Sequence, residues 1–103
     1  MYRLDQHGFL EDFLAWDKKF ALEQLEQLDI ELIFTNKHWQ SLEILRNFHS
    51  EFARHPSMRI LIKLLKQKEL VNNTLELHEL FGPKDLLRTM SLLAGLPKPP
   101  HCI

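Results

Sequence analysis

The chain has 103 residues, of which 45% are apolar and 26% charged, and its formal net charge is -1. This length fits one small domain with a single core, and the near-zero charge excludes a global attraction to nucleic acid or membranes. The single cysteine excludes an internal disulfide, and no apolar run approaches the roughly 20 residues that cross a bilayer. The N-terminal stretch "MYRLDQHGFLEDF" has acidic residues where a secretion signal needs basic and apolar ones, so we expect a cytoplasmic location.

The first third of the chain predicts a short hairpin and one helix. Residues 3–10, "RLDQHGFL", place turn-forming residues between two short apolar pieces, which is typical of a small or truncated β-hairpin. From residue 11 to about residue 28, apolar side chains recur three to five positions apart, as in an amphipathic helix. They are Phe13, Trp16, Phe20, Leu25 and Leu28, widened by Leu14, Ala21 and Leu22.

A second helix is predicted after the connector "LDIELIF", with Thr35 as its N-cap and its end before Pro56. We expect His38, in its first turn, to be structural, because no carboxylate or nucleophile is adjacent in sequence. The apolar face of this helix, which we expect in the core, comprises Trp39, Leu42, Leu45, Phe48 and Phe52.

A third helix is predicted within "SMRILIKLLKQKEL". Its inward residues are Ile60, Leu61, Leu64 and Leu65, and Arg59, Lys63 and Lys66 share one flank at i, i+4 and i+7. Because two helices joined near Pro56 resemble a helix-turn-helix, a nucleic-acid-binding regulator is one alternative function. The apolar character of "ILIKLL" and the near-zero charge argue against it.

The C-terminal third predicts two more helices and an extended arm. Thr74 can cap a helix over "LELHELF". Gly82 is then expected to end this helix, and Pro83 to stand at the first position of the next one. Leu86, Leu87, Met90, Leu93 and Ala94 then follow a helical period up to Gly95, which suits a left-handed terminal residue. We therefore expect a mainly α fold of about five helices over residues 1–95 and a proline-rich arm over residues 96–103.

The arm, "LPKPPHCI", holds the only cysteine one residue from the end. Its three prolines favour extended backbone, so the arm is predicted to present the thiol of Cys102 away from the body. The α-carboxylate of Ile103 raises the pKa of a neighbouring thiol, whereas nearby cations lower it. The cations that we expect to dock the arm or stabilise the thiolate are Arg59, Lys63, Lys98 and His101.

No metal site or cofactor is predicted. The six histidines include no pair at i, i+4, and a lone Cys102 beside His101 cannot complete a tetrahedral zinc site.

Several blocks together resemble the DsrC/TusE family of sulfur-carrier proteins, which includes the so-called gamma subunit of dissimilatory sulfite reductase. The terminal "AGLPKPPHC" with its penultimate cysteine is the most specific of them. The others, in order, are "DQHGFL" followed by Trp16, "TNKHW", "RNFHSEF", "HPSMRILIK" and "ELFGP".

The resemblance implies a function for the terminal thiol. Members with two C-terminal cysteines act in dissimilatory sulfur metabolism, whereas this chain has Leu92 or a neighbour where the second cysteine would stand. The single-cysteine branch accepts persulfide sulfur from a TusBCD complex and gives it to the tRNA 2-thiouridylase, which modifies the wobble uridine. The acceptor complex, with or without its tRNA, would then be the second partner. Cys102 would then be the persulfide carrier, with Arg59 and Lys63 near the arm. A structural subunit that associates with sulfite reductase, like the gamma subunit, is the other alternative.

Overall fold

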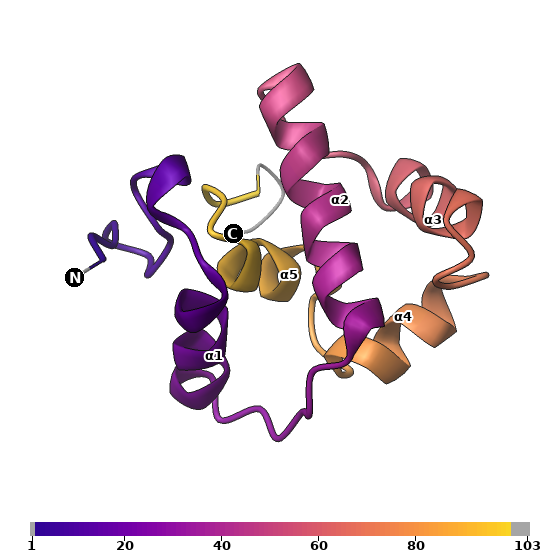
Figure 1. The fold of residues 1–103 in the computed structure, drawn as a ribbon, viewed down its shortest axis with the longest axis horizontal. Coiled ribbons are helices and arrows are strands. Elements are labelled where there is room, and N and C mark those ends of the chain that lie inside the picture. The colour runs from indigo at the N-terminus through magenta and orange to yellow at the C-terminus, as the bar shows by residue number, and fades with distance from the viewer. Residues whose placement is uncertain (1, 100–103) are drawn as a thin grey trace.

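The computed structural model describes residues 2–99, which form five α-helices and one short 3-10 helix. The helices are α1 (Lys18–Gln27), α2 (Asn36–Phe52), α3 (Met58–Gln67), α4 (Thr74–Phe81) and α5 (Leu86–Ala94), and the 3-10 helix is η1 (Phe13–Ala15). In Figure 1, α2 and α5 occupy the middle, with α1 on one side and α3 and α4 on the other. The predicted mainly helical fold of about five helices is confirmed.

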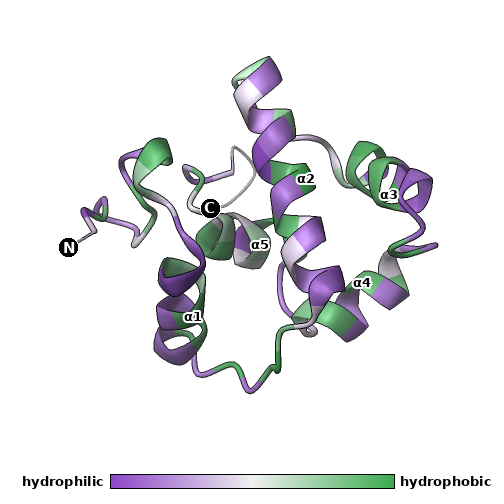
Figure 2. Ribbon diagram, viewed as in Figure 1, coloured by the Kyte–Doolittle hydropathy of each residue, from purple (hydrophilic) through white to green (hydrophobic). Residues whose placement is uncertain are grey.

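The core is centred on α5, which packs against α1, α2 and α4, while α3 packs against α2. All of α5 except two residues is buried, because its short sequence is apolar around most of its surface. The longer helices α2 and α3 show both hydrophobic and hydrophilic residues (Figure 2), so each turns one face to the core. Within residues 2–99, none of the helices is long and apolar enough to span a membrane.

The predicted hairpin is present as a single antiparallel bridge between Leu4 and Leu10. The Asp5 carboxylate closes its turn by accepting hydrogen bonds from the main-chain N–H groups of His7 and Phe9, at 2.8 and 3.0 Å. Gly8 adopts φ +88° in this turn, a conformation that glycine takes without a steric penalty.

Three sequence predictions about element boundaries were wrong, and polar caps explain each of them. The first predicted helix splits, because Asp12 caps η1 and Asp17 begins α1 by accepting from the Phe20 N–H at 2.9 Å. Asn73, not Thr74, caps α4 through the Glu76 N–H, at 2.9 Å. α5 begins at Leu86 behind the cap Asp85, so Pro83 lies in the connection and not at a first helical position.

The predictions for α2 and for the end of α5 were confirmed at the backbone. Thr35 precedes the first residue of α2, which ends at Phe52, and Gly95 ends α5 with φ +70°. Phe52 and Ile60, both predicted to face the core, are 48% and 38% exposed. Phe52 lies in the last turn of α2, where the centroid of its ring is 4.6 Å from that of Phe48.

Candidate functional site

The candidate site is the place where the C-terminal arm leaves the body, here called the arm root and comprising residues 93–99. Gly95 ends α5 in the left-handed conformation, and the Leu96 N–H then donates to the Ser91 carbonyl at 3.0 Å. Leu96 and Pro99 are buried, Lys98 is half-buried and Pro97 is exposed. The described part of the arm therefore packs partly on the body.

Two side chains from distant parts of the sequence bind the last carbonyls of α5. The Trp16 indole N–H donates to the Leu93 carbonyl at 2.8 Å. The Arg46 guanidinium donates to the Ala94 carbonyl at 2.8 Å and to the Phe13 carbonyl at 2.9 Å. These bonds satisfy acceptors that a helix end leaves without an internal partner.

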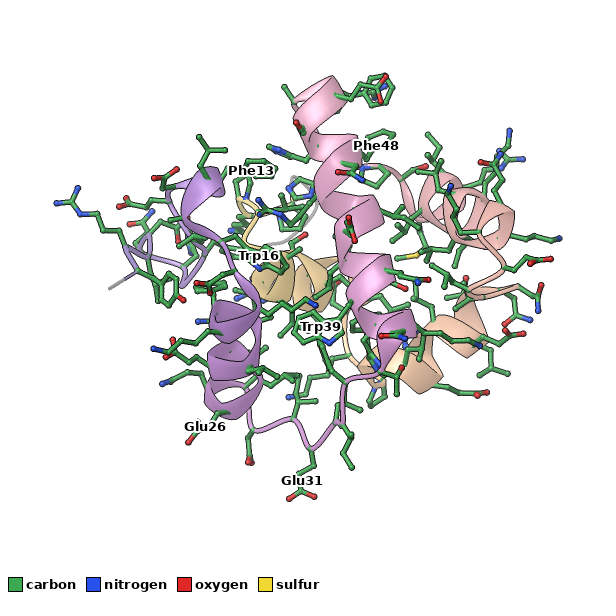
Figure 3. The ribbon with its side chains drawn as sticks, in the orientation of Figure 1. Phe13, Trp16, Glu26, Glu31, Trp39 and Phe48 are labelled. Atoms are coloured by element: carbon green, nitrogen blue, oxygen red, sulfur yellow. The ribbon has the colours of Figure 1, made fainter. Side chains whose placement is uncertain are left out.

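The guanidinium of Arg46 also stacks on aromatic rings. Its central carbon lies 3.9 Å from the ring centroid of Phe13 and 4.5 Å from that of Trp16. Figure 3 shows Phe13 and Trp16 between the N-terminal segment and the end of α5. Burial lowers the pKa of Arg46, but the group stays protonated because its ordinary value is so high.

Two histidines complete the surroundings of the arm root. The ring centroids of His49 and His55 lie 5.5 Å apart. His49 also stacks on Phe13, with 5.8 Å between the ring centroids. The Nδ1 atom of His55 is 3.4 Å from the Ser91 hydroxyl oxygen. Its Nε2 atom is buried and has no hydrogen-bond partner within residues 2–99.

Both of these histidines are held toward the neutral form. Burial is the largest cause that lowers the pKa of His55, followed by the charge of His49, while the Pro97 main chain acts in the opposite direction. Burial and then the Arg46 cation lower the pKa of His49. The Arg46 cation and the His55 imidazole therefore lie beside the arm root, and His49 is a neighbour of both.

The residues predicted from the sequence to form the site do not all lie at the arm root. Cys102 and His101 lie outside the described residues, and Lys98 lies in the arm root. Arg59 and Lys63 are exposed on α3, as the basic flank predicted, and α3 lies on the opposite side of α2 from the arm root (Figure 1).

Sequence reasoning missed the role of Arg46 and gave Trp16 only a packing role. Arg46 follows the buried Leu45 in the middle of α2, and a cation beside an apolar stripe is a signal that its head group has a partner nearby. A half-buried tryptophan likewise needs an acceptor for its indole N–H. Neither signal identifies the partner, because both partners lie in α5.

Within the part of the chain that the structure describes, no group of three His, Cys, Asp or Glu side chains is placed to hold a metal ion.

Comparison with known proteins agrees over the whole chain. The family model described as DsrC like protein matches residues 1–103. The chain is 40% identical to the sulfurtransferase TusE of Pectobacterium atrosepticum, an alignment that covers 96% of this chain and 90% of that protein. It is 37% identical to the TusE of Photorhabdus laumondii, covering 96% of this chain and 88% of the relative.

Solved structures give the same result. The NMR structure of Allochromatium vinosum DsrC matches with a TM-score of 0.83 at 29% identity, covering 99% of this chain and 90% of that one. The oxidized gamma subunit of dissimilatory sulfite reductase from Archaeoglobus fulgidus, also DsrC, matches with a TM-score of 0.78 at 30% identity, covering 99% and 92%. From its sequence and from its fold, the chain belongs to the DsrC family.

Proposed function

We propose that this chain is a sulfur carrier that accepts persulfide sulfur on Cys102 and passes it on for 2-thiouridine formation at the tRNA wobble position. The observation that carries the proposal is the near-full-length similarity to TusE sulfurtransferases, in a chain whose one cysteine stands next to the C-terminus. A carrier needs a single accessible thiol, and a proline-rich terminal segment is a suitable place for one.

The transfer step is thiol chemistry and is balanced without a cofactor. The Cys102 thiolate attacks the outer sulfur of a donor persulfide, so that a new S–S bond forms at Cys102 while the donor's S–S bond breaks. The donor leaves as a thiolate, and the transferred sulfur keeps its proton. One thiolate is consumed and one is released, with no net oxidation.

Release of the sulfur depends on a partner. With no second cysteine in the chain, an internal disulfide cannot expel the sulfur, so the acceptor must supply the attacking thiol. We infer that a donor complex resembling TusBCD and a tRNA 2-thiouridylase, with or without its tRNA, are the two partners, and that the relay operates in the cytoplasm.

The proposal divides the chain into a helical domain, residues 1–95, and the arm, residues 96–103. Lys98 and His101 would stabilise the thiolate from within the arm. Arg59 and Lys63 would do so when the arm docks on α3, which makes the reactivity of Cys102 depend on where the arm lies.

Intact-mass analysis after incubation with glutathione persulfide tests the proposal. The natural chain is expected to gain one sulfur atom, and dithiothreitol is expected to remove it. The Cys102→Ser variant is the matched control and should gain nothing. No gain by the natural chain, with a donor that loads other carrier thiols, would contradict the carrier function.

Association with a sulfite reductase is a second candidate, favoured by the 30% identity to the Archaeoglobus gamma subunit. It predicts that the tagged chain co-purifies with a large reductase and that this association survives Cys102→Ser. A sulfur carrier for tRNA predicts that thiouridine formation is lost in the same variant.

A further inference from the structure

The end of α5 is bound by side chains from outside the helix, at two consecutive carbonyls. The Ser91 carbonyl receives the N–H groups of Gly95 and Leu96, as in an ordinary helix end. The last two carbonyls of α5, on Leu93 and Ala94, accept from the side chains of Trp16 and Arg46. We call these two side chains the carbonyl clamp.

We propose that the carbonyl clamp, Trp16 and Arg46, positions the arm for sulfur transfer by fixing where and in which direction the chain leaves the body. This inference rests on the proposed carrier function of Cys102. Neither residue touches the reacting sulfur in this account, so both are positioning residues.

The geometry of the clamp is over-determined. Trp16 precedes α1, and Arg46 lies in α2. The central carbon of the Arg46 guanidinium lies 4.5 Å from the ring centroid of Trp16, so the two clamp residues also contact each other. Arg46 has a second anchor, the Phe13 carbonyl at 2.9 Å. A shift of the arm root would therefore break bonds to two other segments of the chain.

Gly95 fits against the same indole. A Cβ atom at Gly95 would lie 2.5 Å from Cδ1 of Trp16, closer than such atoms approach in proteins, and 3.0 Å from Cδ2 of Leu10, which is a tight contact. The backbone of the arm root is thus in direct contact with Trp16, and Leu96, the next residue, is fully buried. The packing of Trp16 on Gly95 and the hydrogen bonds of the clamp therefore hold the same part of the backbone, the end of α5.

A fixed starting point matters because the thiol lies further along the chain than the last residue that the clamp holds. Cys102 is three residues beyond Pro99, the last residue of the arm root, and three extended residues span at most about 11 Å. A change of direction at the root displaces the far end of such a segment by several ångströms, whereas a reacting sulfur must reach its partner to within about 3.5 Å. Transfer inside a protein complex should depend on the clamp, and reaction with a small thiol in solution should not.

The test compares Trp16→Phe and Arg46→Met with Trp39→Phe as the matched control. Trp39 is also a half-buried tryptophan, and its ring centroid lies 4.7 Å from that of Phe34. It lies near the start of α2, away from Phe13 and Trp16 (Figure 3). Each folded variant is loaded with glutathione persulfide, and sulfur release is followed first to free glutathione and then to the tRNA 2-thiouridylase with its tRNA.

We expect loading and release to free glutathione to stay within about twofold of the natural chain in every variant. With the thiouridylase, kcat should fall at least about tenfold in Trp16→Phe and Arg46→Met, with KM within about twofold, because docking of the body is retained while the fraction of productive geometries falls. Trp39→Phe should behave as the natural chain. Arg46→Lys, which keeps a cation but loses the two-pronged donor, should recover part of the loss.

A kcat equal to that of the natural chain in folded Trp16→Phe and Arg46→Met would overturn the inference and leave the clamp a purely structural feature. Should Arg46→Met fail to fold, Trp16→Phe decides the question alone, compared with its control Trp39→Phe. Failure of the natural chain to take up sulfur from glutathione persulfide would instead overturn the proposed function, and the positioning role with it, so the two failures are distinct.

Discussion

The imidazole of His38 links the start of α2 to the end of α4. Its Nδ1 atom accepts from the Thr35 N–H at 3.0 Å, and Nε2 lies 2.7 Å from the Leu80 carbonyl, which assigns the proton to Nε2 in the neutral ring. Burial is the main cause that lowers the pKa of His38, and the Leu80 bond opposes it. The expectation that His38 is structural agrees with these contacts.

Stability should therefore fall in mildly acidic solution. Since His38 in the folded state binds a proton less readily than in the unfolded state, the free energy of unfolding is highest above the ordinary histidine pKa of about 6.5 and decreases as pH falls through the lowered value. Urea unfolding at pH 7.5, 6.5 and 5.5 should show this decrease. The slope should be smaller in His38→Gln than in the natural chain, and equal slopes in the two proteins would contradict the assignment.

Gly95 should be among the least replaceable residues of the chain. Gly95→Ala forces a left-handed alanine and a contact with the Trp16 ring, so we expect it to lower the free energy of unfolding by about 2–4 kcal/mol. Gly8→Ala is the control, because Gly8 also has positive φ but a Cβ there would meet nothing within 4 Å. Its loss should be about 1–2 kcal/mol, and equal losses would show that the Trp16 contact contributes nothing.

Among the helices, α3 carries the basic flank that the sequence predicts. Arg59, Lys63 and Lys66 are all exposed, and α3 contains no acidic residue. If the arm docks there, Arg59→Ala with Lys63→Ala should raise the pKa of the Cys102 thiol and slow its alkylation by iodoacetamide at pH 7. Lys18→Ala with Lys19→Ala on α1 is the matched charge control. An unchanged thiol pKa in the α3 variant would remove these two residues from the site.

Helices were predictable where a long apolar period met a clear cap. α2, with 17 residues behind Thr35, satisfies both conditions, and its bounds followed from the sequence. Around α1 the apolar period runs on across Asp12 and Asp17, yet each carboxylate caps a separate helix, so the local hydrogen bonds outweighed the period. In α4, Asn73 and Thr74 are both good caps, and the sequence does not rank them.

For the molecule as a whole, the sequence predicts the chemistry that we propose for the site, and it does not predict the geometry of the arm root. The terminal thiol and the prolines behind it are local features of the sequence. The bonds from Trp16 to Leu93 and from Arg46 to Ala94 join residues 77 and 48 positions apart. Such contacts depend on how α1, α2 and α5 pack together, which no local pattern encodes.

The helices packed around α5 should unfold together, in one cooperative transition. Leu93→Ala removes a fully buried side chain from the centre of the core, so we expect a loss of about 2–5 kcal/mol. Leu14→Ala, at a position 86% exposed, should change the free energy of unfolding by less than about 0.5 kcal/mol. Urea unfolding followed by circular dichroism and by tryptophan fluorescence should give coincident transitions in both, and separate transitions would contradict a single body.

The most direct test of the carrier function follows the sulfur itself. The chain is loaded at Cys102 with ³⁵S persulfide, freed of donor, and mixed with the tRNA 2-thiouridylase, ATP and tRNA for a single turnover. We expect the label to move from the protein to 2-thiouridine, and we expect Cys102→Ser neither to load nor to support transfer. Label that stays on the loaded chain, while the same enzyme thiolates tRNA from another persulfide donor, would contradict the relay to tRNA.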